Sequence, residues 1–252
     1  MNNSLEYACR YITSYWSFFY FLRPLVLLTI IYCLYHIVKS PNKNRLRQLC
    51  IIYLACAGFI FSYIEPCTLV RMLYLQKISY RSMSMFFEYT TSIFQVVEFY
   101  IFYSIINLSI NDLKLRMLRN FGTSILILLL PIIFHSIHNS KTFQSILFNG
   151  EFFAGISNAL LLPGFVVFVN RCYKQSIHST YTMPTILSVF CYVITSLLIY
   201  PCTSFLFRDY KNLSFLLYCY HYVVMAIVVL TMKYNVTKIK EGPNKLMTFN
   251  IN

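Results

Sequence analysis

The chain has 252 residues, of which 58% are hydrophobic and only 12% are charged. A soluble globular domain carries about a quarter charged residues, so this composition excludes that class and indicates a membrane protein. The formal net charge of +13 does not indicate nucleic-acid binding, because the basic residues lie in short loops between apolar runs.

Seven apolar segments predict an all-α fold, namely a polytopic seven-transmembrane-helix bundle. In chain order the predicted spans are Trp16–Val38, Gln48–Pro66, Phe86–Leu108, Phe121–His138, Phe152–Asn170, Pro184–Phe207 and Leu213–Met232. Residues 1–15 are then an extracytoplasmic N-terminus, residues 16–232 the membrane domain and residues 233–252 a basic cytoplasmic tail. The loops between the spans are too short for a soluble catalytic domain.

The distribution of Lys and Arg predicts the orientation of the bundle. The first, third and fifth loops and the tail carry 13 of these residues, whereas the N-terminus and the other loops carry 7. Basic loops stay on the cytoplasmic side, so the N-terminus is expected outside and the tail inside. The nine Cys lack CxxC spacing, and we interpret them as small packing residues rather than as disulfides or metal ligands.

The third span, Phe86–Leu108, carries two carboxylates and an amide within an otherwise apolar run. On a helix that turns about 100° per residue, Gln95 and Glu98 share one face with Glu88. This polar stripe should not face lipid, because a charged group near the bilayer centre costs about 2.5–3.5 kcal/mol.

Other spans place ionisable groups in the same outer half, including Arg23 in the first span and His221 in the seventh. The inner half has almost none, so we expect the outer groups to converge on an outward-facing polar cavity. The candidate ligand-binding residues are Arg23, Glu88, Gln95, Glu98 and His221.

Some of these groups also have simpler interpretations. Glu65, His135, His138 and Glu151 lie close enough to span ends to be interfacial, as does Glu88. Arg23 could extend along its stem to the headgroups. Glu98 could form a structural contact, for example with Arg23, or it could serve a ligand or a proton.

A sensor or accessory signalling component with a cytoplasmic or membrane signalling partner is the favoured function. The alternative is a small secondary transporter or channel using intramembrane carboxylates. A lack of polar groups in the inner half argues against that alternative. A zinc enzyme assembled from His135, His138, Glu151 and His221 is disfavoured because HExxH spacing is missing, so we expect no catalytic residues, no metal and no cofactor.

Two well-known seven-helix classes are also disfavoured. The third span ends in Asn111–Asp112–Leu113 rather than in the D/E-R-Y triplet of G-protein-coupled receptors. A retinal protein needs a lysine inside the seventh span, and the first lysine there is Lys233, at the end of the span.

Several short motifs resemble those of small uncharacterised seven-helix integral membrane proteins of Bacteroidota. They are Phe87–Glu88–Tyr89, Val97–Glu98–Phe99–Tyr100, Glu151, Met183–Pro184 and Tyr200–Pro201. The chain differs from that group in lacking a Trp near Pro184. The resemblance implies a multi-pass protein of the bacterial inner membrane that works beside a partner such as a sensor kinase, and it supplies no catalytic residue.

Overall fold

The computed structural model describes residues 16–41, 44–73, 80–139, 150–175, 182–205 and 211–238, which form seven α-helices and no strand. The helices are α2 (Trp16–Lys39), α3 (Arg45–Leu73), α4 (Tyr80–Ile110), α5 (Leu113–Asn139), α6 (Gly150–Gln175), α7 (Met183–Phe205) and α8 (Lys211–Lys238). Six contain a stretch long and apolar enough to cross a membrane, and α7 contains a shorter apolar stretch. The predicted all-α helical bundle is therefore confirmed.

Each predicted span coincides with one helix, but most helices are longer than predicted. Helix α5 begins at Leu113, well before the predicted start at Phe121, and α8 continues past Met232 to Lys238. The first residues of the predicted tail are therefore helical. The predicted N-terminal segment, residues 1–15, and the remainder of the tail, residues 239–252, lie outside the described residues.

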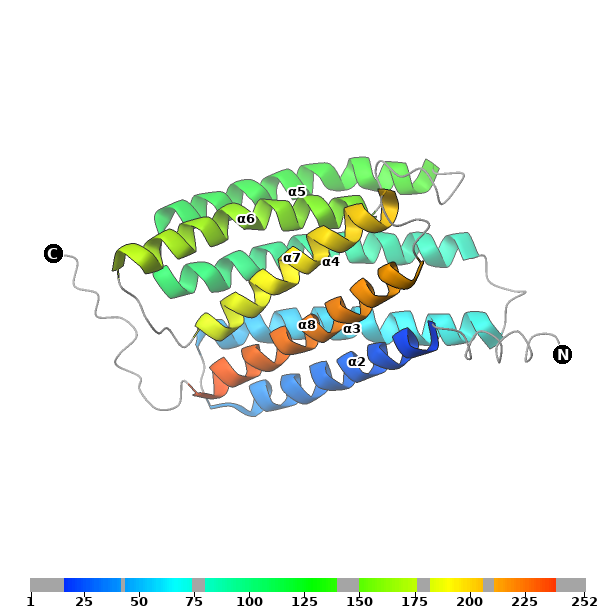
Figure 1. Ribbon diagram of the computed structural model, residues 1–252, viewed down its shortest axis with the longest axis horizontal. Coiled ribbons are helices and arrows are strands. Elements are labelled where there is room, and N and C mark those ends of the chain that lie inside the picture. The colour runs from blue at the N-terminus through cyan, green and yellow to red at the C-terminus, as the bar shows by residue number, and fades with distance from the viewer. Residues whose placement is uncertain are drawn as a thin grey trace.

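The helices alternate in direction, so the α2–α3 and α4–α5 connections and the last turn of α8 meet at one end of the bundle (left in Figure 1). We call this the basic end, because it carries Lys39, Arg45, Arg47, Lys114, Arg116, Arg171, Lys233 and Lys238. The opposite end is called the outer end, after the predicted orientation.

Helix ends at the basic end are fixed by side chains that bond to the backbone. Arg47 donates from Nε to the carbonyl of Ile37 at 2.9 Å and from Nη2 to that of Val38 at 2.6 Å, which satisfies the last turn of α2. Asn44 Oδ1 accepts the N–H of Arg47 at 2.8 Å and caps the start of α3. This capping makes the α2–α3 connection tight.

The α4–α5 corner is equally short. Asn111 has a positive φ of 52°, the left-handed conformation that commonly ends a helix, and its N–H bonds to the carbonyl of Asn107 at 2.7 Å. Asp112 then caps α5 by accepting the N–H of Lys114 at 2.7 Å.

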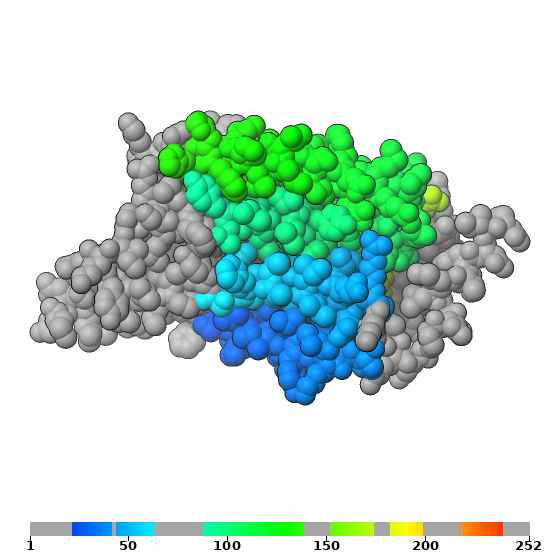
Figure 2. Space-filling model, turned by 180° about the vertical axis from the view of Figure 1, so that it is seen from behind, coloured from blue at the N-terminus to red at the C-terminus, as the bar shows by residue number. Residues whose placement is uncertain are grey.

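Six helices form a ring in the order α2, α3, α4, α6, α7 and α8, and α8 packs back on α2. Helix α5 lies outside this ring against α4 and α6, at the top of Figure 1. Figure 2 shows the face on which α5, α4, α3 and α2 follow one another from top to bottom. Helix α4 contacts α3, α5, α6 and α7, which makes it the central helix of the bundle.

The surface of the bundle is apolar, and much of its polarity is inside. Leu28 on α2, Leu128 on α5 and Val166 on α6 are each more than half exposed. Ser92, Glu98 and Asn158 are by contrast almost fully buried. This distribution suits a lipid environment, in which polar groups are satisfied within the protein.

Candidate functional site

The carboxyl group of Glu98 lies in the core of the bundle and is 1% exposed. Tyr53 of α3 donates its hydroxyl to Oε1 at 3.1 Å, and Tyr192 of α7 donates to Oε2 at 3.5 Å. Each oxygen of this acid is thus held by a tyrosine from a different helix. Among the described side chains, no cation forms an ion pair with Glu98, so the predicted pairing with Arg23 is not what holds it.

The contacts continue from Tyr192 to α8. The ring of Tyr192 stacks on the imidazole of His221, with centroids 4.7 Å apart and an interplanar angle of 29°. His221 Nδ1 lies 3.3 Å from Thr195 Oγ1 and 3.4 Å from Ser196 Oγ. The residues Tyr53, Glu98, Tyr192, Thr195, Ser196 and His221 are named here the Glu98 cluster, and they connect four helices.

The hydrogen-bond directions constrain the imidazole of His221. Thr195 Oγ1 already donates to the carbonyl of Tyr192 at 2.8 Å, so towards His221 it is available as an acceptor. A proton on Nδ1 satisfies this geometry, whereas Ser196 can donate to an unprotonated Nδ1. The two hydroxyls can therefore serve Nδ1 in either of its protonation states.

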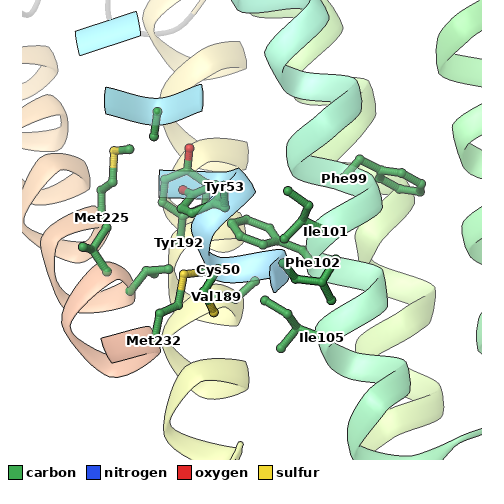
Figure 3. Close-up of a cluster of buried hydrophobic side chains, with 14 of the residues drawn as sticks. Cys50, Tyr53, Phe99, Ile101, Phe102, Ile105, Val189, Tyr192, Met225 and Met232 are labelled. Atoms are coloured by element: carbon green, nitrogen blue, oxygen red, sulfur yellow. The ribbon is translucent and has the colours of Figure 1, made fainter. Parts of the chain in front are cut away.

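An apolar layer borders the Glu98 cluster on the side of the basic end. In Figure 3, Phe102 of α4 and Val189 of α7 lie below Tyr53 and Tyr192, together with Cys50 of α3. These residues are almost fully buried.

On the outer side of Glu98 the contact between α4 and α6 is polar. Ser157 donates to the carbonyl of Gln95 at 3.4 Å. The side-chain oxygens of Gln95 and Asn158 are both buried and accept no hydrogen bond from the described residues. A buried acceptor left unpaired costs about 1–3 kcal/mol, so these two amides provide binding capacity for a polar molecule.

The other two predicted site residues lie further out. Arg23 is half-buried and donates from Nε to the hydroxyl of Tyr222, the residue after His221, at 3.3 Å. Glu88 is also half-buried, about 15 Å along α4 from Glu98. The structure thus connects Glu98 to His221 through Tyr192, and it brings Arg23 to Tyr222, the residue next to His221. Glu88 lies closer to the outer end of the bundle.

The three histidines of the disfavoured zinc site do not come together. His135 and His138 are exposed on α5, which contacts α4 and α6 but not α8, where His221 is buried. Glu65 and Glu151, the other acids predicted at the outer end, lie outside the side chains that the structure describes.

The expectation that the inner half lacks polar groups is wrong. Ser188 and Thr231 are hydrogen-bonded at 2.9 Å between α7 and α8, and Asn235 donates to Thr185 one turn further in. These side chains are short and uncharged, so a search for ionisable residues passes over them. Asn107 of α4 is a further buried polar side chain near the basic end.

The basic end also contains an ion pair that links helix α6 to the α4–α5 connection. Arg171 of α6 donates from Nε to Asp112 Oδ2 at 2.7 Å, and Asp112 is buried while Arg171 is partly exposed. Burial alone would raise the pKa of the Asp112 carboxyl, but the N–H of Lys114 and the Arg171 guanidinium outweigh it and hold the pKa below its ordinary value. Asp112 therefore stays ionised and fastens α6 to the α4–α5 corner.

Tyr53 and Tyr192 are functional candidates that the sequence did not reveal. The chain has 22 tyrosines, and tyrosine is common at membrane interfaces, so composition gives no reason to select these two. Tyr192 does carry a weak signal, because Ser188 and Thr195 lie four residues before it and three after it, on one helix face. Tyr53 has no comparable pattern.

The arrangement can bind or release a proton at an acid and an imidazole that share one tyrosine. No protein-family model, curated protein or solved structure matches the chain. The geometry of the Glu98 cluster is therefore the observation from which a function can be inferred.

Proposed function

We propose that this chain is a multi-pass sensor or accessory signalling component of the cell membrane. A proton or a small polar ligand that reaches the Glu98 cluster from the outer end is the signal. The observation that carries the proposal is the attachment of both Glu98 oxygens to tyrosines of α3 and α7. Any change in the charge or partners of this acid alters the force between the central helix and two of its neighbours.

Burial makes such a change consequential. In a low-dielectric core a hydrogen bond to a charged group contributes about 1.5–3 kcal/mol, roughly twice a neutral one. A ligand that takes over one tyrosine hydroxyl, or a proton that neutralises the acid, therefore changes the free energy of helix packing. The change is comparable with the free-energy difference of a few kcal/mol between the two conformations of a two-state protein. The stack of Tyr192 on His221 carries the change to α8, which ends at the basic end.

The apolar layer favours sensing over transport. Phe102, Val189 and Val228 are at most 1% exposed, and Phe102 and Val189 lie on the basic-end side of Tyr53 (Figure 3). A buried polar cluster bordered by apolar side chains towards the basic end suits a receptor for a signal better than a path through the membrane. A partner in the membrane or the cytoplasm would receive the motion of α8.

A secondary transporter remains the second candidate because of one observation. Thr185, Ser188, Tyr192 and Thr195 repeat at spacings of three and four along α7, so polar groups follow one face of that helix from the basic end to the Glu98 cluster. Rotation of α7 or α8 could join them into a path for protons or a small cation.

One experiment in reconstituted vesicles distinguishes the two functions. Lowering the external pH from about 7.5 to about 5.5 should change amide hydrogen exchange in α7 and α8 of the wild type without acidifying the vesicle interior. Glu98→Gln should be expressed near the wild-type level and should not show the change.

The other outcomes are equally clear. Acidification of the interior that Glu98→Gln abolishes would establish transport instead. An unaltered exchange response in Glu98→Gln would refute both roles of the acid, and failure of that variant to fold would assign Glu98 to structure alone.

A further inference from the structure

A cluster of lysines and tyrosines lies on the lipid-facing surface where α2 and α8 meet at the basic end. On α2, Tyr32, Tyr35 and Lys39 share one face, and Tyr32 and Tyr35 are about half exposed. On α8, Lys233 reaches across to α2 and donates to the hydroxyl of Tyr32 at 2.8 Å. We call Tyr32, Tyr35, Lys39, Lys233 and Tyr234 the α2–α8 basic patch.

Each lysine of this patch is held against a tyrosine ring. Lys39 Nζ lies 4.3 Å from the centroid of the Tyr35 ring, and Lys233 Nζ lies 4.2 Å from that of Tyr32. Neither lysine forms an ion pair with a carboxylate among the described residues. The described acid at this end, Asp112, is already bonded to Arg171 on another part of the bundle. The patch therefore carries positive charge that no described residue neutralises.

The surface next to the patch is apolar in the direction of the bilayer core. Leu28 lies one turn before Tyr32 on α2 and is 61% exposed, and on α8 Ile227 and Leu230 precede Lys233 and are each 45% exposed. The positively charged patch with its hydroxyl groups suits the headgroup of an anionic phospholipid, and the exposed apolar surface beside it suits the acyl chains.

We propose that the α2–α8 basic patch binds an anionic phospholipid, with the phosphate between Lys39 and Lys233 and the acyl chains along Leu28 and Ile227. Lys233 already bridges the two helices through Tyr32. A phosphate that takes both ammonium groups strengthens the contact by which the last helix of the ring closes on the first. The site is independent of the Glu98 cluster and does not depend on the sensor function.

The test is native mass spectrometry of the purified chain titrated with phosphatidylglycerol or with phosphatidylcholine. Wild-type protein should retain phosphatidylglycerol in preference to phosphatidylcholine. The variant Lys39→Gln/Lys233→Gln should bind phosphatidylglycerol about tenfold less tightly or worse, as expected for two lysines near an anionic group. The control Lys114→Gln/Arg116→Gln removes the same charge from exposed positions on α5 at the same end and should bind almost as well as the wild type.

Equal losses in the two variants would show a diffuse effect of net charge and would overturn the proposal, as would equal retention of the two lipids. A photoreactive phosphatidylglycerol tests the wild type directly. It should label α2 within residues 28–39 and α8 within residues 227–238, whereas labelling concentrated on α5 and α6 would overturn the site even if the double variant failed to fold.

Discussion

Gly122 on α5 allows the ring of Phe99 to pack against the helix backbone, and Gly122→Ala tests this contact. A Cβ placed on Gly122 would lie 2.3 Å from Phe99 Cζ, whereas ordinary contact begins at 3.4 Å. The ring would have to move by about 1.1 Å, the difference between these two distances. Phe99 is fully buried and packs on Tyr103 at a centroid distance of 4.9 Å, so it has little room to move.

The expected magnitude follows from two opposing effects. Overpacking of a buried site costs about 1–3 kcal/mol, and a clash of this size belongs at the upper end. Alanine is favoured over glycine inside a helix by about 1 kcal/mol. Gly122→Ala should therefore lower the free energy of unfolding by about 2 kcal/mol, despite being a mutation to a better helix former.

Gly155 on α6 provides the matched control. A Cβ at that position would meet no atom within 4 Å, so Gly155→Ala should leave stability unchanged or raise it by up to about 1 kcal/mol. The assay is reversible unfolding in mixed micelles by titration with a denaturing detergent, followed by circular dichroism. If Gly122→Ala were as stable as Gly155→Ala, the reasoning about the Phe99 contact would be refuted.

Two further predictions concern polar contacts. Asp112→Asn keeps a capping residue on α5 but loses the charge paired with Arg171, so it should destabilise the protein by about 0.5–1.5 kcal/mol at pH 7, since the partner is partly exposed. Because the folded pKa of Asp112 is lowered, its contribution is present above the ordinary pKa of about 4 and is lost as pH falls through the folded value. Thermal unfolding of the two proteins at several pH values should therefore converge in acid, and a constant difference would contradict the ion pair. Tyr222→Phe should cost less than about 1 kcal/mol by the same measurement, because the ring stays beside the half-buried Arg23, and a larger loss would mean that this contact is structurally essential.

The number and order of the helices were predictable because a bilayer imposes a minimum apolar length on each span. Helix ends were harder, as α5 shows. Its first turns carry Lys114, Arg116 and Arg119, which interrupt the apolar run, although the chain is already helical there. Asp112 as an N-cap marked the true start, but a hydropathy criterion gives no weight to capping.

The buried positions of Glu98 and His221 were also predictable, since ionisable groups in a membrane span should face the protein interior. Their actual partners were not. The sequence suggested opposite charges, such as Arg23, whereas the structure supplies the hydroxyls of Tyr53 and Tyr192. Which tyrosine points inward depends on the rotation of each helix about its axis, and aromatic residues occur on every face of these helices.

A double-mutant cycle between Tyr53→Phe and Glu98→Met tests most directly whether tyrosine hydroxyls hold Glu98 in place, because it measures the coupling free energy between the two side chains. In the wild-type background Tyr53→Phe removes a donor from the buried acid and should cost about 1–3 kcal/mol of unfolding free energy. In the Glu98→Met background the same hydroxyl has lost its acceptor, so its removal should be neutral or stabilising. The coupling energy between the two sites should be at least about 1 kcal/mol, and equal effects of Tyr53→Phe in both backgrounds would show that the hydroxyl does not hold Glu98.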